Sequence, residues 1–317
     1  MDQFCPMIIV ICVQTKPQEI KMVKTNENVC ISGPRVTNFV YNVKLGERYR
    51  DYIKMANKMG CYAEYCPNSN SIILEMPNKT QEMPNLKNLL RTKEFLQSKY
   101  NLPVVLGVDV FGNPVVKDLD KMAHILIGGK TGSGKTELLK TIYESVLHNH
   151  KPQDYFVIID TKGVDFAKYN DNEFREVIVD INKAIIKLQE ICEIIDHRRK
   201  NCKKSDKNKI GRIIVMVDEF ADLIATNKKS MEKIVQFIAS YGRGVGVCLI
   251  MATQHIDKSV VTGIIKANLT TRIALKTKTN TESKCLLGES GAELLLNYGD
   301  MLLSDAGRTP IRIHVAN

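Results

Sequence analysis

The sequence predicts an α/β protein with a mainly parallel, doubly wound sheet, preceded by a smaller α+β domain. From about Leu119 onward, short apolar runs alternate with segments of helical periodicity, which is the pattern of successive βαβ units. Before that point, short strand-like runs surround an amphipathic stretch at residues 52–59 and close with the hairpin signal Phe111-Gly-Asn-Pro114. We therefore divide the 317 residues into a small N-terminal domain, 1–116, and a larger domain, 117–317.

A glycine-rich segment stands at the first βα junction of the larger domain. Residues 129–136 match G-x-x-x-x-G-K-[ST] in full, between a short apolar run at 124–127 and apolar residues at helical spacing over 137–147. Such a junction directs backbone N–H groups and the positive end of a helix dipole toward a bound polyphosphate. The residues expected to bind the nucleotide are Gly129, Lys130, Thr131, Gly132, Ser133, Gly134, Lys135, Thr136 and Glu137.

A second buried strand supplies the acidic partners of this loop. The apolar run 213–217 ends in Asp218 and Glu219, where an open parallel sheet presents catalytic groups. We expect Lys135 to bridge the β- and γ-phosphates of ATP. Thr136 and Asp218 would hold Mg²⁺, and Glu219 would orient or deprotonate the attacking water. A strand leading into a helix N-terminus also favours Asp and Glu through the dipole alone, so the catalytic interpretation depends on the phosphate loop upstream.

A third apolar run, residues 247–252, ends in Thr253 and Gln254. This polar pair is suited to sensing the γ-phosphate, and Gln254 is included among the candidate catalytic residues with Lys135 and Glu219. Taken alone, the pair is a weak signal.

Several further stretches carry a family resemblance. They are residues 33–37, 106–116, 218–224, 252–254, 262–268, 271–274 and 291–302. Together they resemble the motor of the FtsK/SpoIIIE family of DNA translocases over nearly the whole chain from about residue 30. The resemblance implies a RecA-like P-loop ATPase motor domain at 117–317, preceded by the smaller domain and assembled as a hexameric ring around double-stranded DNA.

The resemblance also assigns roles to individual residues. It implies that Arg243 reaches the nucleotide of the neighbouring subunit, and that Lys266 and Lys284 present basic side chains to the DNA backbone. The sequence departs from the family pattern at three positions. His255 and Lys284 stand where arginine is usual, and Gly288 stands where an acidic residue is typical. These departures put in doubt the coupling of pore loops and subunit contacts to turnover, and leave hydrolysis untouched.

Composition agrees with this interpretation. A net charge of +10, from 45 basic and 35 acidic residues, suits a polyanionic partner. Nine cysteines without a C-x-x-C pair favour a reducing, cytoplasmic location. The apolar run at 7–13 is too short to cross a bilayer and is expected to be a buried strand, so no membrane segment is expected. The sequence stops at residues 311–317, where the motor is expected to end, so no winged-helix domain is expected. The basic stretch from His197 to Lys209 is expected to be a solvated helix end and loop.

The sequence therefore predicts an ATP-driven, ring-forming translocase of double-stranded DNA. Two alternatives remain open. One is a related P-loop motor for protein secretion or conjugative coupling. The other is a switch or scaffold that binds ATP and hardly turns over, and Glu219 argues against it because a switch has little need of a water-activating carboxylate.

Overall fold

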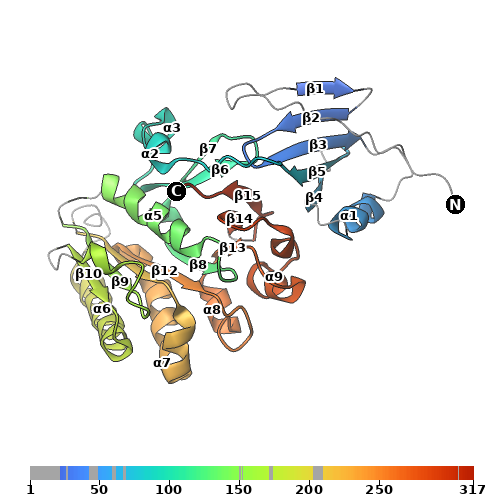
Figure 1. Ribbon diagram of the computed structural model, residues 1–317. Coiled ribbons are helices and arrows are strands. Elements are labelled where there is room, and N and C mark those ends of the chain that lie inside the picture. Colours follow the sequence, from blue (N-terminus) through green and yellow to red (C-terminus); the bar gives the residue numbers. More distant parts are fainter. Residues whose placement is uncertain are drawn as a thin grey trace.

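The structure is a computed structural model that describes residues 22–25, 28–42, 49–58, 62–66, 69–149, 151, 153–170, 174–202, 210–305 and 307–317. These residues form a smaller sheet and a larger sheet, side by side (Figure 1). The strand expected at residues 7–13 and the basic residues 203–209 lie outside the described residues.

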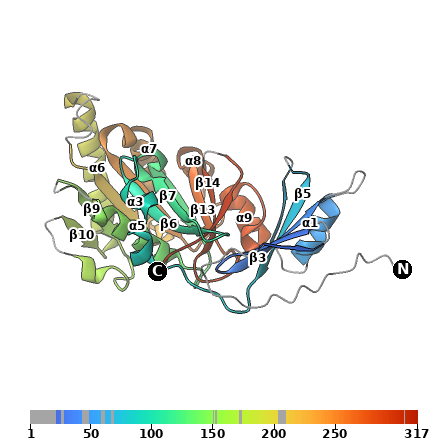
Figure 2. The same ribbon diagram turned by 90° about the horizontal axis from the view of Figure 1, so that it is seen from above.

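The smaller sheet is antiparallel and has the strand order β1-β2-β3-β5-β4. The amphipathic stretch predicted around residues 52–59 is helix α1, which packs against β4. Together they lie to one side of the larger sheet (Figure 2). The elements are β1 (Met22–Thr25), β2 (Asn28–Ser32), β3 (Val36–Asn42), α1 (Tyr49–Lys58), β4 (Tyr62–Cys66) and β5 (Ser71–Pro77).

The larger sheet has the order β10-β9-β11-β12-β8-β13-β14-β15-β6-β7. Its strands from β10 to β13 are parallel, which confirms the predicted mainly parallel α/β fold, and antiparallel strands continue the sheet from β14 to β7. The strands are β6 (Pro103–Asp109), β7 (Pro114–Asp118), β8 (His124–Gly128), β9 (Tyr155–Ile159), β10 (Arg175–Ile178), β11 (Ile213–Val217), β12 (Val247–Thr253), β13 (Thr271–Leu275), β14 (Asp300–Asp305) and β15 (Ile311–His314).

Helices cover both faces of this sheet because successive strand residues point to opposite sides. Ile158, Met216 and Ile250 pack toward the face covered by α5, whereas Val157 and Val215 pack toward α6 and α7. The helical elements are α2 (Leu86–Leu89), α3 (Lys93–Leu96), α4 (Leu119–Met122), α5 (Lys135–His148), η1 (Ala167–Tyr169), α6 (Ile181–Asn201), α7 (Phe220–Tyr241), η3 (Arg243–Val245), α8 (Gly263–Asn268), α9 (Asn280–Leu287) and η4 (Ala292–Leu294).

The predicted hairpin at Phe111–Pro114 joins β6 to β7, and both strands belong to the larger sheet. A boundary at residue 116 would therefore cut through β7. We propose instead to draw the domain boundary between β5 and α2, where the chain leaves the smaller sheet.

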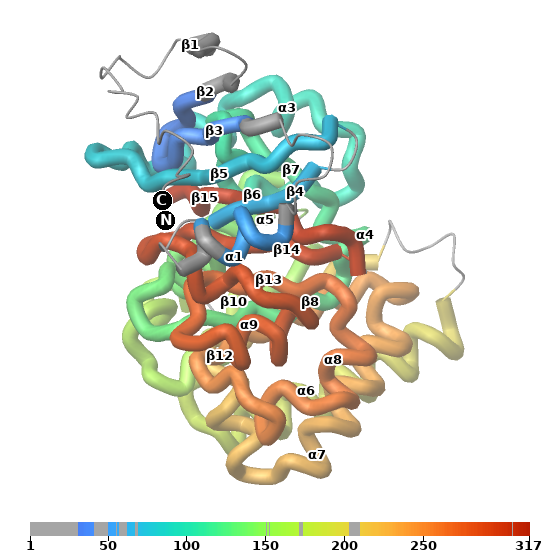
Figure 3. The backbone as a smooth tube through the Cα atoms, turned by 90° about the vertical axis from the view of Figure 1, so that its right-hand side faces the viewer, coloured from blue at the N-terminus to red at the C-terminus, as the bar shows by residue number. Residues whose placement is uncertain are grey.

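A buried ionic cluster joins the two sheets where β5 lies alongside β15 (Figure 3). Arg312 on β15 donates through Nη1 to Glu75 on β5, and its Nε and Nη2 donate to Asp300 on β14 at 3.0 and 2.6 Å. Burial opposes ionisation of Asp300, but Arg312 and His314 hold its pKa well below the usual range. Because breaking a buried pair leaves an uncompensated charge, this cluster fixes the smaller sheet against β14 and β15.

Candidate nucleotide site

The glycine-rich segment forms the turn between β8 and α5. Gly132 and Gly134 adopt φ angles of +74° and +102°, a region that favours glycine. A Cβ on Gly134 would lie 2.5 Å from the backbone nitrogen of Gly299, so the turn also needs a residue without a side chain for close packing. Gly129 N donates to Thr253 O at 3.3 Å and Lys130 N to Lys276 O at 2.9 Å. The neighbouring strands β12 and β13 therefore hold the loop in place.

Lys135 begins α5 and is buried, with 6% of its surface exposed. Its Nζ donates to the loop's own Gly129 O at 2.8 Å. Burial lowers the pKa of Lys135 to about 8, and the nearby Glu219 and Asp218 act in the opposite direction. A cation inside the loop's curve, beside backbone N–H groups, is the arrangement that binds polyphosphate.

Glu219 caps α7 at the tip of β11 and is 3% exposed. Its Oε1 accepts from the Thr253 hydroxyl at 2.7 Å, and the backbone N–H of Gln254 donates to both carboxylate oxygens, at 3.2 and 3.1 Å. The strand pair β11 and β12 therefore fixes the orientation of this carboxylate. The Thr253 hydroxyl, which the sequence assigns to the γ-phosphate, thus has a further role that no local pattern signals, as a donor to Glu219.

Asp218 follows β11 directly and is 5% exposed. Burial, with the neighbouring Asp160 and Asp165, raises its pKa to about 6. Lys162 and Lys135 act against that rise. Negative charges of Asp160 and Asp165 thus act on Asp218 together with the positive charges of two lysines. Within the described residues, protein side chains alone form no group of three or more metal ligands.

The loop after β9 was missed by the sequence analysis. Asp160 is buried and shapes this loop by accepting from the N–H groups of Gly163 at 3.1 Å, Asp165 at 3.0 Å and Phe166 at 3.0 Å. The turn carries Lys162 and Asp165 to the nucleotide pocket. A signal was present, because polar residues follow the buried run 155–159 directly, as they do after β11.

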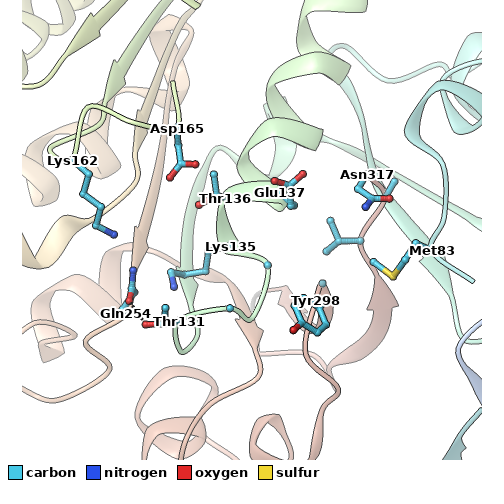
Figure 4. A pocket seen from close by; sticks show the side chains of 15 residues that line it. Met83, Thr131, Lys135, Thr136, Glu137, Lys162, Asp165, Gln254, Tyr298 and Asn317 are labelled. Carbon is cyan, nitrogen blue, oxygen red and sulfur yellow. Dashed lines mark hydrogen bonds between the residues drawn. The ribbon is translucent and has the colours of Figure 1, made fainter. Parts of the chain in front are cut away.

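A pocket of about 420 Å³ extends along the phosphate loop (Figure 4). Lys162 and Gln254 lie on one side of Lys135, and Met83, Tyr298 and Asn317 lie on the other. Thr131 Oγ1 donates to the Gln254 side-chain oxygen at 2.6 Å, which ties the two predicted residues together. The lining residues are Met83, Thr131, Gly132, Gly134, Lys135, Thr136, Glu137, Lys162, Asp165, Gln254, Tyr298, Gly299, Val315, Ala316 and Asn317.

Arg243 is not part of this pocket. It is exposed in η3, which precedes β12, whereas the phosphate loop follows the carboxyl end of the parallel strand β8. Arg243 therefore lies at the opposite edge of the sheet, where burial and its charge lower the pKa of His124 to about 4. Arg198 donates to Val245 O at 2.9 Å and fixes the turn. Arg198 is half-buried against η3, whereas His197, Arg199 and Lys200 are exposed at the end of α6, as expected for a solvated helix end.

Lys266 and Lys284 lie on α8 and α9, the helices before and after β13. Lys284 is exposed and Lys266 is half-buried. Gly288 ends α9 with φ +94°, and its N–H donates to Lys284 O at 3.0 Å. The departure noted at Gly288 thus has a local reason, since a helix commonly ends with glycine in this left-handed conformation.

The sheet order and the glycine-rich turn between β8 and α5 define an α/β protein of the P-loop class. Residues 85–211 match the FtsK/SpoIIIE family. The chain is 34% identical to the DNA translocase FtsK of Haemophilus influenzae over 296 residues, covering 80% of this chain and 56% of that protein. It is 33% identical to the DNA translocase SftA of Bacillus subtilis, covering 92% of this chain and 34% of the relative. The chain belongs to the FtsK/SpoIIIE family, and it spans about a third to just over half of the length of these relatives.

Solved structures share the fold at lower identity. The conjugation coupling protein TcpA of pCW3, in a monomer form with ATPγS, superposes with a TM-score of 0.65 at 22% identity, covering 91% of this chain and 88% of TcpA. The cytoplasmic domain of the type VII secretion ATPase EccC of Thermomonospora curvata also has a TM-score of 0.65, at 23% identity over 74% of this chain and 32% of EccC. Among the described residues, no helix is both long enough and apolar enough to cross a membrane.

Proposed function

We propose that this chain hydrolyses ATP to move double-stranded DNA. The observation that carries the proposal is the shared edge of the parallel sheet. There the buried Lys135 donates to a carbonyl oxygen of the phosphate loop, and the buried Glu219 accepts hydrogen bonds from Thr253 and Gln254 at the end of the next strand. A cation for phosphates beside an oriented carboxylate for water is what phosphoryl transfer to water requires. DNA as the polymer is supported by the relatives, which are named DNA translocases.

Each residue then has a separate task at the phosphates. Lys135 binds the β- and γ-phosphates, and Glu219 accepts a proton from the attacking water or orients it. Thr136 and Asp218 would hold Mg²⁺, which neutralises charge on the phosphate oxygens when it is bound. Such an ion keeps water and phosphate oxygens as its remaining ligands, so a complete protein cage is not needed. Gln254, held by Thr131, senses whether the γ-phosphate is present.

Steady-state ATPase activity with and without linear duplex DNA tests the proposal. Stimulation many-fold by duplex DNA is the expected result. An ATPase rate that does not change when DNA is added would favour a motor for protein secretion. That alternative stays open because the type VII secretion ATPase EccC shares the fold. Negligible turnover with tight ATP binding would identify a switch or scaffold and contradict the proposal.

We further propose that the chain works as a closed ring, in the manner of a hexamer, with Arg243 completing the site of the next subunit. The support is its exposed position at the sheet edge opposite the pocket, where it cannot reach its own nucleotide. An arginine supplied in trans typically accelerates phosphoryl transfer by about a thousandfold or more. Mixing Arg243→Ala with Lys135→Ala protein should regain activity, since some junctions then pair an intact Arg243 with an intact Lys135. Mixed assemblies without any activity would contradict the role.

Lys266 and Lys284 are proposed to contact the DNA backbone in the ring's pore. Each phosphate that a lysine neutralises contributes a slope of about −0.9 to the plot of log binding constant against log salt concentration. Lys266→Ala should flatten that slope and weaken DNA stimulation of the ATPase. We place the protein in the cytoplasm, a proposal supported by the nine cysteines of the sequence, which include no C-x-x-C pair.

A further inference from the structure

Residues 297–299 lie directly against the phosphate loop. Gly299 N donates to Ser133 O at 2.7 Å, and Tyr298 N approaches Gly132 O at 3.4 Å. Tyr298 adopts φ +59°, a left-handed conformation that a tyrosine rarely takes. Such a backbone conformation persists only where surrounding contacts impose it, so these hydrogen bonds constrain the segment.

The Tyr298 side chain is 70% exposed and lines the pocket together with Met83 and Val315. It lies on the far side of Lys135 from Gln254 (Figure 4). Phosphates bound by the loop, with the γ-phosphate toward Gln254 and Glu219, would leave the nucleobase at this other end. An exposed aromatic ring beside apolar side chains is suited to stacking against a base.

Arg35, from the smaller sheet, holds the backbone of this segment. Its Nη1 donates to Tyr298 O at 3.0 Å and its Nη2 to Asn297 O at 2.7 Å. Nε and Nη2 also donate to the side-chain oxygen of Gln81, at 3.2 and 3.1 Å. Arg35 is 1% exposed, so its guanidinium is buried where it donates to two carbonyl oxygens next to the pocket. The planar guanidinium of arginine presents five N–H donors in a fixed geometry, which suits it to several acceptors at once.

We propose that Tyr298 is the platform on which the nucleobase stacks, and that Arg35 positions this platform from the neighbouring sheet. The inference rests on the proposed nucleotide binding and adds the base-binding end of the same site. Stacking on an aromatic face tolerates any base. The platform should therefore favour a nucleotide over a bare polyphosphate and discriminate little between ATP and GTP.

Calorimetric titration of the full chain with ATP and with inorganic tripolyphosphate tests the platform. Tyr298→Ala should weaken ATP binding by about tenfold, the lower part of the range for loss of one base–aromatic stack, and leave tripolyphosphate binding unchanged. Tyr298→Phe keeps the ring and should bind ATP as the wild type does. Tyr100→Ala, a substitution of a tyrosine that is 41% exposed outside the pocket, is the matched control.

Arg35→Lys keeps the charge but cannot span the same acceptors, and it should weaken ATP binding in the same direction while sparing tripolyphosphate. Combined with Tyr298→Ala, it should add little, because both changes remove one stacking interaction. Gln81→Ala removes only the acceptor that steadies Arg35 and serves as a milder second variant if Arg35→Lys does not fold. Thermal melting is recorded for each variant.

The outcomes distinguish a failure of the base platform from a failure of nucleotide binding itself. A lowered melting temperature with an unchanged ratio of ATP to tripolyphosphate affinity would show that Arg35 only joins the sheets, and would overturn its positioning role. Equal losses for both ligands in Tyr298→Ala would overturn the platform. A wild-type chain that binds neither ligand would refute nucleotide binding itself, and this inference with it.

Discussion

The two ends of the nucleotide pocket are built in different ways. The phosphate end comes from short segments that follow the neighbouring parallel strands β8, β11 and β12, with Lys135 and Glu219 both buried and held by hydrogen bonds. The other end is assembled from segments far apart in the chain, because Met83, Tyr298 and Asn317 meet there, with Arg35 behind them. One end presents fixed charges and N–H groups, and the other presents an exposed ring.

This difference implies a division of labour. Interactions that act on the transferring phosphoryl group change the catalytic rate, whereas contacts to a remote, unreacting part of the substrate chiefly change affinity. Substitutions at the phosphate end should therefore alter binding of every polyphosphate or the rate of hydrolysis. Substitutions at the base end should alter affinity for nucleotides only.

The largest effects are expected for Lys135→Ala and Glu219→Gln. Lys135→Ala removes the cation that faces the phosphates and should abolish detectable binding of both ATP and tripolyphosphate. Glu219→Gln should still bind ATP but hydrolyse it about 10²- to 10⁴-fold more slowly in a single-turnover assay, the usual range for loss of a general base. Lys93→Ala, an exposed lysine on α3, is the control.

Near wild-type turnover by Glu219→Gln would remove that residue from the chemistry. Selective loss of ATP binding by Lys135→Ala, with tripolyphosphate binding intact, would break the comparison, since it would assign Lys135 to the base end.

A second prediction concerns the contact between the two ends. Gly134→Ala would place a Cβ 2.5 Å from Gly299 N and 2.8 Å from Gly299 Cα, at a φ of +102°. We expect the free energy of unfolding to fall by about 1–3 kcal/mol from backbone strain, and more if the segment shifts. Denaturant unfolding with and without ATP measures both the loss of stability and the loss of nucleotide stabilisation.

Gly132→Ala is the matched control for this change. Its φ is also positive, +74°, but its Cβ would meet nothing within 4 Å. Gly132→Ala should therefore show strain without disturbing residues 297–299. Equal losses of ATP binding in the two variants would mean that the contact with Gly299 is unimportant.

Much of the phosphate end could be predicted, because the loop residues 129–136 are contiguous in sequence and because Asp218–Glu219 and Gln254 stand at the ends of apolar runs. Glycines and the lysine of the loop are required at fixed spacing by the geometry of phosphate binding. The base end has no such local signal. Tyr298 lines the pocket on a segment whose carbonyl oxygen accepts a hydrogen bond from Arg35, more than 260 positions earlier in the chain. Sequence periodicity cannot reveal a contact that arises when two sheets pack.

The smallest expected effect tests how finely the phosphate end is tuned. Thr253→Val keeps the shape of the side chain but removes the hydroxyl that donates to Glu219 at 2.7 Å. Glu219 keeps the backbone N–H of Gln254 as a partner, at 3.2 and 3.1 Å, so the carboxylate stays in place but is less tightly oriented. We expect kcat to fall about tenfold, which corresponds to about 1.4 kcal/mol of activation free energy, with KM for ATP little changed. Thr253→Ser retains the hydroxyl and should behave as the wild type. A rise in KM without a change in kcat would show instead that Thr253 contacts the nucleotide. Its role would then be to bind substrate, and the orientation of Glu219 would not depend on it.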